Sequence, residues 1–286
     1  MNANVAIIGF ATLDYVLTTE RPIVGPGTVL ANALSSDWPR AGGAALYAAR
    51  RLHDAGHAVS PIVSIGDDAH GVAYNKACEA AGIALDGVFE VKGGKTTCCF
   101  LIYHDDGRYT CLLDIGTAAA QTLSSEQAEI VDAADLVIIA AAEARLIERT
   151  LKSLKTSQQV AWIAKNDPSC FPLDLCRSLA ERADFIFYNS SERHLVEPFL
   201  DRVKPHTAVF ETRGAAGVQT RRGNDQWFIP ATPLDIDDAT GAGDTFAGAT
   251  LAAMLIQGTT PAVAAKNGVD QVHRFLASRI GMAPSE

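Results

Sequence analysis

The chain alternates between short, uninterrupted apolar runs and longer segments whose apolar residues recur at helical spacing. The apolar runs are typical of buried strands, and they cover residues 5–9, 59–65, 136–140, 160–164, 185–188 and 208–211. The helical spacing predicts helices at residues 41–55, 71–81, 144–154, 173–183, 190–200, 243–256 and 261–278. Strands that are apolar throughout and alternate with helices indicate a mostly parallel sheet covered on both faces. We therefore expect a three-layer α/β/α sandwich.

Two regions depart from this alternation. Residues 11–40 contain several prolines and glycines and no long helical pattern. Residues 85–114 contain successive strand-like runs with turn signals at 93–94 and 105–107. Strands that follow one another without helices favour antiparallel pairing. We interpret both regions as a small β-sheet inserted in a single domain that spans residues 1–286, and as a candidate lid.

Composition narrows the class of protein. The chain has 286 residues, 48% of them apolar, and a formal net charge of −9. This acidic balance argues against nucleic acid or an anionic membrane as the main partner. No apolar run approaches the ~18 residues of a membrane helix, and no basic segment precedes the first apolar run, so we expect a cytoplasmic protein. The six cysteines include no CxxC pair, and we expect them to be buried, reduced thiols.

The most informative stretch is a turn of small residues placed between two acids. Gly241, Ala242 and Gly243 separate Asp238 from Asp244 and open into an apolar helical pattern. The free N–H groups and the dipole at a helix start can hold an anion such as a phosphate. The alternative interpretation is a glycine turn followed by an Asp that caps the helix. The turn alone does not decide between the two.

Two common phosphate motifs are incomplete in this chain. The segment that ends in Gly94, Lys95 and Thr96 has Phe89 where a P-loop requires its first glycine. The turn at 241–243 has Phe246 where a dinucleotide fingerprint requires its third glycine. A dinucleotide-dependent oxidoreductase is therefore disfavoured.

Six short motifs occur in one order along nearly the whole chain. They are Gly9-xxxx-Asp14, Gly42-Gly43, Gly66-Asp67-Asp68-xx-Gly71, Asn189-xx-Glu192, Thr212-x-Gly214-xx-Gly217 and Asp238-Ala-Thr-Gly-Ala-Gly-Asp244. This series resembles the ribokinase (PfkB) family of carbohydrate and nucleoside kinases. The resemblance implies a ribokinase-like sandwich with a β lid, and ATP-dependent phosphoryl transfer to a hydroxyl of a small sugar-like or nucleoside acceptor.

The resemblance also implies the catalytic groups. Asp244 would take the proton from the acceptor hydroxyl. The backbone N–H groups of Gly241, Ala242, Gly243 and Asp244 would form an anion hole for the transferred phosphoryl group. Asp238 and Thr240 resemble a site for a monovalent cation such as K⁺ that occurs in part of the family.

On the nucleotide side, the resemblance assigns ATP and Mg²⁺. Asn189 and Glu192 would help to hold Mg²⁺ through water. Their spacing is also that of a helix N-cap with a capping-box Glu, and both interpretations can hold together. Residues placed along the nucleotide by similarity are Thr212, Gly214, Gly217 and, near the adenine, Asn267. A strand-end turn for the first three and a solvated helix position for Asn267 remain alternatives.

The acceptor side follows the family less regularly. Asp14 matches an acid that binds sugar hydroxyls, and Gly42 and Gly43 match a glycine pair whose backbone approaches the sugar. Glu143 falls where some relatives place a sugar-binding acid. Arg108, in the candidate lid, would meet an anionic acceptor, although a solvated Arg is the simpler interpretation.

Two positions differ from ribose-specific relatives. Ala44 stands in place of a Lys, and Tyr47 in place of an Asn that faces the acceptor. The loss of two polar contacts should weaken the binding of a plain pentose. Tyr47 would stack on a ring of the acceptor or shape a larger pocket; the alternative is a helix Tyr that faces the core. These departures motivate a second hypothesis, a catalytically weak, kinase-fold protein that binds a metabolite or regulates. The resemblance further implies a homodimer formed through the lid.

Overall fold

A computed structural model describes residues 2–34, 38–104 and 109–280. Its larger sheet has nine strands in the order β14-β13-β12-β11-β10-β9-β1-β5-β6. The strands are β1 (Asn4–Ile8), β5 (Ala58–Gly66), β6 (Val88–Val91), β9 (Leu136–Ile139), β10 (Gln159–Ile163), β11 (Phe185–Asn189), β12 (Ala208–Thr212), β13 (Gly217–Arg222) and β14 (Asp225–Pro230). The pairs from β6 to β12 are all parallel, and β13 and β14 are antiparallel.

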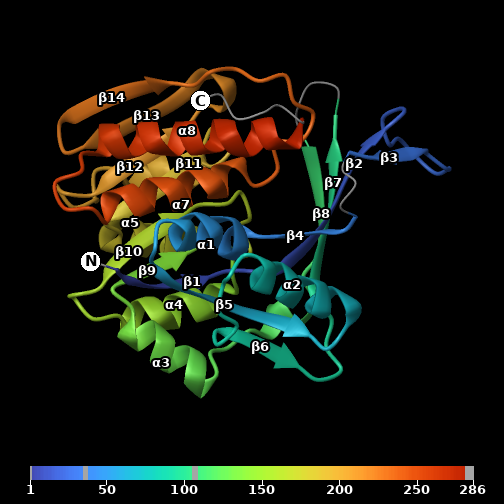
Figure 1. Ribbon diagram of the computed structural model, residues 1–286, viewed down its shortest axis with the longest axis horizontal. Coiled ribbons are helices and arrows are strands. Elements are labelled where there is room, and N and C mark those ends of the chain that lie inside the picture. Colours follow the sequence, from blue (N-terminus) through green and yellow to red (C-terminus); the bar gives the residue numbers. More distant parts are fainter. Residues whose placement is uncertain (1, 35–37, 105–108, 281–286) are drawn as a thin grey trace.

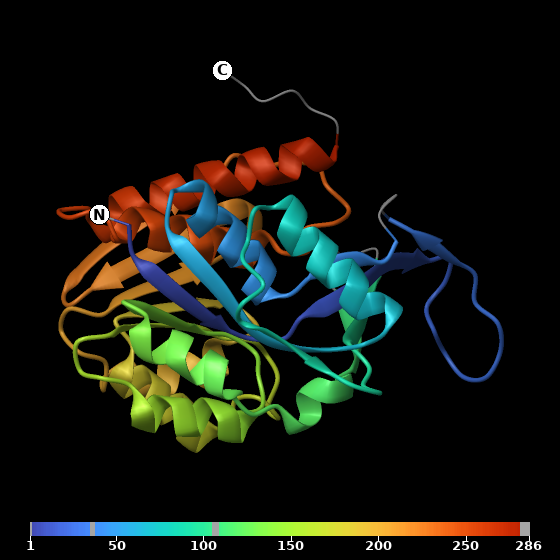
Figure 2. The same ribbon diagram turned by 60° about the horizontal axis from the view of Figure 1, so that its bottom comes forward.

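Helices cover both faces of this sheet (Figures 1 and 2). One layer comprises α1 (Ala44–Asp54), α2 (Ala69–Ala80), α7 (Ala242–Met254) and α8 (Pro261–Arg279). The other comprises α3 (Ser125–Ala133), α4 (Ala144–Ser153), α5 (Leu173–Arg182) and the short α6 (Arg193–Val196). Alternate residues of a strand point to opposite faces, so Val5 and Ile7 enter one core while Ala6 and Ile8 enter the other. The predicted three-layer sandwich is confirmed.

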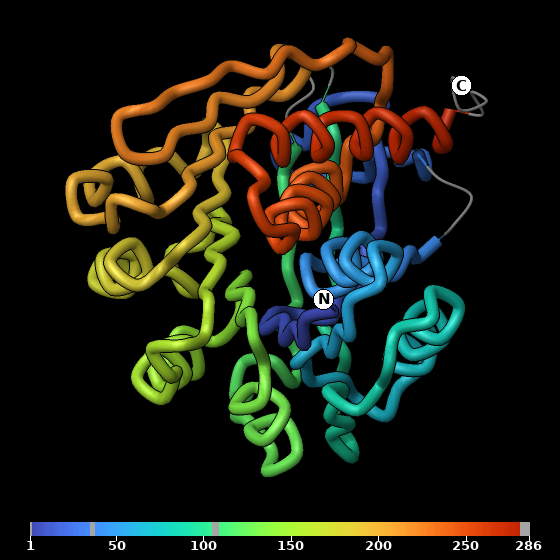
Figure 3. The backbone as a smooth tube through the Cα atoms, turned by 60° about the vertical axis from the view of Figure 1, so that its left-hand side comes forward, coloured from blue at the N-terminus to red at the C-terminus, as the bar shows by residue number. Residues whose placement is uncertain are grey.

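Figure 3 shows how the first layer is built around α7. Helix α7 lies between α1 and α8, and its side chains are buried over most of its length. The burial of α7 fixes the position of its first turn, which carries the small-residue motif.

Within the described ranges, no helix combines the length and the apolar character that crossing a membrane requires.

A second, five-stranded sheet lies at one side of the molecule (Figure 1). Its strands are β2 (Thr12–Thr19), β3 (Ala31–Ala33), β4 (Arg40–Gly42), β7 (Thr97–Tyr103) and β8 (Tyr109–Asp114). The expected antiparallel pairing holds for β2–β3, β2–β4 and β7–β8. It is wrong for β2–β7, which pair in parallel because a long crossover through the body separates them. Strand β6, within the range 85–114, pairs instead with β5 of the large sheet.

Other local differences have simple causes. The range 190–200 forms only α6 and a single 3₁₀ turn at Glu197–Phe199, where Pro198 lacks the N–H group that would continue the helix. The apolar pattern did not predict α3 or the polar hairpin β13–β14. The turn at 105–107 lies outside the described residues.

The cysteine expectation is correct only in part. All six are free thiols, and Cys78, Cys99, Cys170 and Cys176 are buried. Cys98 is half-buried, and Cys111 is exposed because it lies on β8, the edge strand of the small sheet. The sulfurs of Cys99 and Cys111 are 3.1 Å apart.

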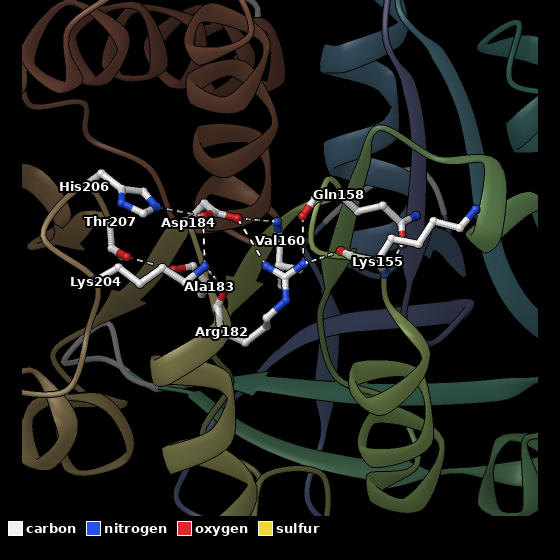
Figure 4. Close-up of polar contacts among 9 residues, drawn as sticks. All are labelled: Lys155, Gln158, Val160, Arg182, Ala183, Asp184, Lys204, His206 and Thr207. Atoms are coloured by element: carbon white, nitrogen blue, oxygen red, sulfur yellow. Dashed lines mark hydrogen bonds and ion pairs between the residues drawn. The ribbon is translucent and has the colours of Figure 1, made fainter.

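A polar network ties together the segments that precede β10, β11 and β12 (Figure 4). The Asp184 carboxylate accepts hydrogen bonds from the Val160 N–H (2.9 Å) and from Lys204 Nζ (3.1 Å). Arg182 donates to the Gln158 carbonyl (2.7 Å), and Lys204 also donates to the Arg182 carbonyl (2.6 Å). These bonds satisfy backbone groups at the amino ends of the strands. Parallel strands present their carboxyl ends at the opposite edge, where α/β proteins place ligands.

Candidate active site

The small-residue turn begins α7. Gly241 is the N-cap, with φ 80° and ψ 0°, and a Cβ atom there would lie 2.6 Å from the ring of Tyr47. Both the left-handed conformation and the close approach require glycine. Gly243 is exposed, and a Cβ atom there would meet nothing within 4 Å. The turn therefore faces open space at Gly243.

The N–H groups of the turn differ in their availability. The Ala242 N–H donates to the Ala239 carbonyl at 3.0 Å. It is therefore not free for an anion, contrary to the prediction that Ala242 contributes to the anion hole. The N–H groups of Gly243 and Asp244 have no acceptor among residues 2–34, 38–104 and 109–280. Together with the helix dipole, these two donors suit an anion.

Asp244 does not cap the helix, so that alternative interpretation is wrong. Its buried Oδ1 lies 2.8 Å from Nζ of Lys165, a residue that follows β10. Burial alone would lower the pKa of Lys165, but the carboxylates of Asp244 and Glu192 raise it above its ordinary value. Lys165 is therefore charged at neutral pH, and it links Asp244 to Glu192 electrostatically.

Asn189 and Glu192 make the contacts of a local cap. Glu192 Oε2 accepts from the Asn189 N–H (2.7 Å), and Asn189 Oδ1 accepts from the Ser191 N–H (2.8 Å). Burial raises the pKa of Glu192, while the Lys165 charge acts in the opposite direction.

These residues supply the hard oxygen donors that Mg²⁺ prefers. The described residues contain no cluster of three or more His, Cys, Asp or Glu side chains that could hold a metal ion by themselves. Mg²⁺ usually keeps several waters and uses one or two carboxylates together with substrate phosphates. The donor set around Glu192 fits that kind of site.

Asp14 lies on β2 with its carboxylate packed on Gly42. A Cβ atom at Gly42 would lie 2.0 Å from Asp14 Oδ2, so the glycine makes room for the acid. Burial raises the pKa of Asp14 to about 6, and the negative charges of Asp244 and Asp238 contribute to the rise. Gly43 caps α1 with φ 87°, and a Cβ atom there would lie 2.3 Å from the Phe10 carbonyl oxygen. The structure thus brings Asp14 within electrostatic reach of Asp244.

The residues predicted to hold a monovalent cation do not fit one. The Asp238 carboxylate lies 2.8 Å from Arg40 and 3.5 Å from Arg279. Arg279 also donates to the Asp238 carbonyl at 3.0 Å. Although burial alone would raise the pKa of Asp238, the two guanidinium charges hold it below its ordinary value. The two arginines bind Oδ2 and the carbonyl oxygen of Asp238, and the Thr240 N–H donates to Oδ1, so each of these oxygens already has a donor.

Thr240 is likewise engaged. Its hydroxyl lies 3.1 Å from the hydroxyl of Tyr103, on strand β7 of the small sheet. The loop that leads into α7 therefore contacts the small sheet twice, at Arg40–Asp238 and at Tyr103–Thr240.

Tyr47 faces the core. Its side chain is 3% exposed, its ring packs on Gly241, and it meets Phe275 edge-on with 5.9 Å between ring centroids. This corrects its assignment as a residue that stacks on the acceptor, because a buried ring has no free face. Tyr47 instead supports the turn that begins α7.

The residues assigned to the nucleotide lie near one another in the sheet. Thr212 ends β12 beside Asn189 of β11, and Gly214 and Gly217 have positive φ values of 57° and 121°. Asn267, on α8, donates to the Ala249 carbonyl of α7 at 3.1 Å. That bond joins the two helices, and Asn267 is exposed, as a solvated helix position would be.

Two residues that the resemblance assigned to the acceptor, Glu143 and Arg108, are not placed beside Asp14 by the structure. Glu143 caps α4 by accepting from the Leu146 N–H (2.7 Å). It lines a pocket of about 570 Å³ that includes neither Asp14 nor Asp244 in its lining. Arg108 lies outside the described residues.

The sequence motifs missed three charged residues of this region: Lys165, Arg40 and Arg279. Lys165 could have been noticed as a charge directly after a buried strand, at the carboxyl edge of the sheet. Arg40 and Arg279 lie about 240 residues apart in sequence, and only the fold brings both to Asp238.

Comparison with known proteins identifies the family of this chain. The family model for "pfkB family carbohydrate kinase" matches residues 2–269. The chain belongs to the pfkB family of carbohydrate kinases. An ATP-dependent ribose-1-phosphate kinase from Halopiger xanaduensis is 26% identical over 264 residues, with 87% of this chain and 84% of that protein covered. A ribokinase from Bacillus subtilis is 24% identical, with 85% and 83% covered.

Solved structures of other kinases share the fold. The nucleoside kinase of Methanocaldococcus jannaschii superposes with a TM-score of 0.78 at 17% identity, over 96% of this chain and 93% of that one. The predicted family and its ribokinase-like fold, a large mostly parallel sheet with a smaller lid-like sheet, are confirmed.

Proposed function

We propose that the protein transfers the γ-phosphoryl group of ATP to a hydroxyl of a small sugar-like or nucleoside acceptor. The observation that supports this most directly is the start of α7. There, the N–H groups of Gly243 and Asp244, which have no acceptor among the residues that the structure describes, stand beside the buried Asp244 carboxylate. Anion binding and proton acceptance are the two functions that such a transfer requires at one point.

In the proposed reaction, Asp244 accepts the proton of the acceptor hydroxyl while the hydroxyl oxygen bonds to the γ-phosphorus. The bond from that phosphorus to the bridging oxygen breaks, and ADP leaves. The N–H groups of Gly243 and Asp244 stabilise the charge on the transferred group. Mg²⁺, when bound, would neutralise phosphate charge, with Glu192 and Asn189 holding it through water.

Asp14 supports a polyhydroxylated acceptor. A buried carboxylate that reaches the same region as Asp244 can accept hydrogen bonds from sugar hydroxyls. The nucleotide would lie along Thr212, Gly214 and Gly217, where the positive-φ glycines let a ligand approach the backbone.

The proposal is tested by Asp244→Asn, with Asp270→Asn on the outer surface of α8 as the matched control. We expect acceptor-stimulated ADP release to fall by about 10²–10⁴-fold for Asp244→Asn, and ATP affinity to change little. The control should keep full activity, because the partner of Asp270 among the described residues is Lys266, at the surface of the same helix. More than a few per cent activity in Asp244→Asn would remove Asp244 as the base.

The alternative, a weak kinase that mainly binds a metabolite, is tested with the unmodified protein. We expect ADP release to rise on addition of one member of a panel of sugars, phosphosugars, sugar acids and nucleosides. A panel that binds without any such rise would favour the binding protein.

We also propose a homodimer through the small sheet. Phe100 and Leu112 are paired across β7 and β8 and are 38% and 54% exposed, and Tyr15 stacks on Phe100 at 4.8 Å. An exposed apolar face of this kind is typical of an interface. Light scattering should show that Leu112→Asp halves the mass, whereas Leu173→Asp on α5, equally exposed, leaves it unchanged.

A further inference from the structure

Among the residues that the structure describes, Lys165 is the one that forms an ion pair with the Asp244 carboxylate, and the family motifs do not include it. Its Nζ lies 2.8 Å from Asp244 Oδ1, and 35% of its side-chain surface remains exposed. Asp244 itself is almost fully buried, with 8% of its side chain exposed. A ligand can therefore reach Lys165 without displacing the protein around it.

The contacts of Lys165 differ from those of a structural lysine in the same protein. Lys204 donates to a backbone carbonyl, that of Arg182, and to Asp184, and so helps to fix three strands. In the part of the chain that the structure describes, Asp244 is the only acceptor within ion-pair or hydrogen-bond distance of Lys165 Nζ. A lysine ammonium has three donors, so two of them remain for a ligand.

The Lys165 ammonium lies beside the first turn of α7, where the proposed anion would bind. An anion bound by the N–H groups of Gly243 and Asp244 would lie next to the Asp244 side chain. Lys165 already contacts that side chain. Asp244 and Glu192 both keep Lys165 charged. A compact, charged ammonium is a common ligand for phosphate oxygens.

We propose that Lys165 binds the γ-phosphoryl group of ATP and is a further catalytic residue of the transfer. This inference rests on the proposed function. In the absence of ligand, Lys165 pairs with Asp244. When ATP binds, Lys165 contacts oxygens of the γ-phosphoryl group and continues to do so as that group moves from the bridging oxygen of ADP to the acceptor oxygen. The Asp244 oxygen is then free to accept the hydroxyl proton.

The test compares the affinities for a non-hydrolysable ATP analogue and for ADP, measured by calorimetry without any acceptor. We expect Lys165→Met to weaken binding of the analogue about tenfold and binding of ADP less than about twofold, because only the analogue carries a γ-phosphoryl group. Lys165→Arg should restore most of the difference. Lys152→Met is the matched control, since Lys152 forms a similarly short pair with Glu148 on the exposed surface of α4.

The outcomes separate the two proposals. If the unmodified protein binds neither nucleotide, the proposed function fails and the role of Lys165 fails with it. If the unmodified protein binds both but Lys165→Met weakens them equally, or weakens neither, Lys165 does not contact the γ-phosphoryl group and the kinase proposal stands. Circular dichroism of each variant confirms that it is folded before its affinities are compared.

Discussion

Arg40 lies opposite Asp14 in the pairing of β4 with β2, and its guanidinium binds the Asp238 carboxylate at 2.8 Å. One side chain thus joins β4, the strand that pairs with β2 at Asp14, to the loop that leads into α7. Arg279, at the end of α8, completes the arrangement from the other side of Asp238. The loop that leads into the first turn of α7 is therefore held by two positive charges.

This arrangement predicts that the kinase does not need K⁺. Replacement of K⁺ by tetramethylammonium should change turnover less than about twofold, because the guanidinium groups already neutralise Asp238. Arg279→Met should lower turnover about tenfold or more, since it leaves a buried carboxylate with one partner fewer. Initial rates of ADP release measure both effects.

The control for Arg279→Met is Arg274→Met, which changes an exposed arginine of the same helix. It should behave like the unmodified protein. A K⁺ activation greater than about tenfold in the unmodified protein would show that a cation site exists elsewhere in the fold.

The two glycines of the turn should separate stability from activity. Gly241→Ala places a methyl group against the ring of Tyr47 and strains a left-handed residue, so it should lower the free energy of unfolding by about 1–3 kcal/mol. Gly243→Ala meets no protein atom within 4 Å and lies in the first turn of α7, so it should leave stability unchanged or raise it by up to about 1 kcal/mol.

Activity should follow a different order. The methyl group of Gly243→Ala points into the space proposed for the phosphoryl group, so we expect kcat to fall at least tenfold in a fully stable protein. Denaturant unfolding and initial rates on the same samples provide the comparison. A stable and fully active Gly243→Ala would place the phosphoryl group elsewhere.

Asp14 should make stability depend on pH in a defined direction. Its pKa rises from an ordinary 3.8 to about 6 in the folded protein, so the folded state holds the proton more tightly than the unfolded state does. Asp14 therefore destabilises the fold progressively as pH rises from about 4 to about 6, by about 3 kcal/mol in total.

Asp14→Asn removes this penalty. Its stability relative to the unmodified protein should increase between pH 4 and 6 and stay constant above about pH 7, as measured by urea unfolding. The exposed Asp54→Asn serves as a control and should show no such trend. A difference that does not change with pH would mean that Asp14 is not buried as an acid.

Much of the fold could be read from the apolar pattern because buried parallel strands and helices have distinct periodicities. Residues 136–140 and 185–188 were predicted nearly to their ends as β9 and β11. The parallel pairing of β2 with β7 could not be predicted, since pairing over about 80 residues leaves no local signal. The hairpin β13–β14 was missed because its two strands are rich in polar residues and contain no continuous apolar run.

The sequence indicates residues whose place depends on local backbone conformation. It does not indicate residues whose place depends on contacts between distant segments. Gly241 and Gly43 are fixed by local conformation, which a glycine reveals in the sequence. The partners of Asp238 come from β4 and α8, and the partner of Asp244 comes from the loop after β10. A resemblance carried by motifs does not include residues that fall between them.

The backbone passes between the body and the small sheet at four places, residues 9–11, 43, 92–96 and 115. A loop lid has two attachment points, and either can act as a hinge. Here, any displacement of the sheet must be accommodated at four places at once, and one of them is the glycine that begins α1. The exposed tip between β2 and β3 lies beyond all of these crossings. A cut or an insertion at that tip would therefore leave the sheet attached, which makes the tip the natural place for a reporter group.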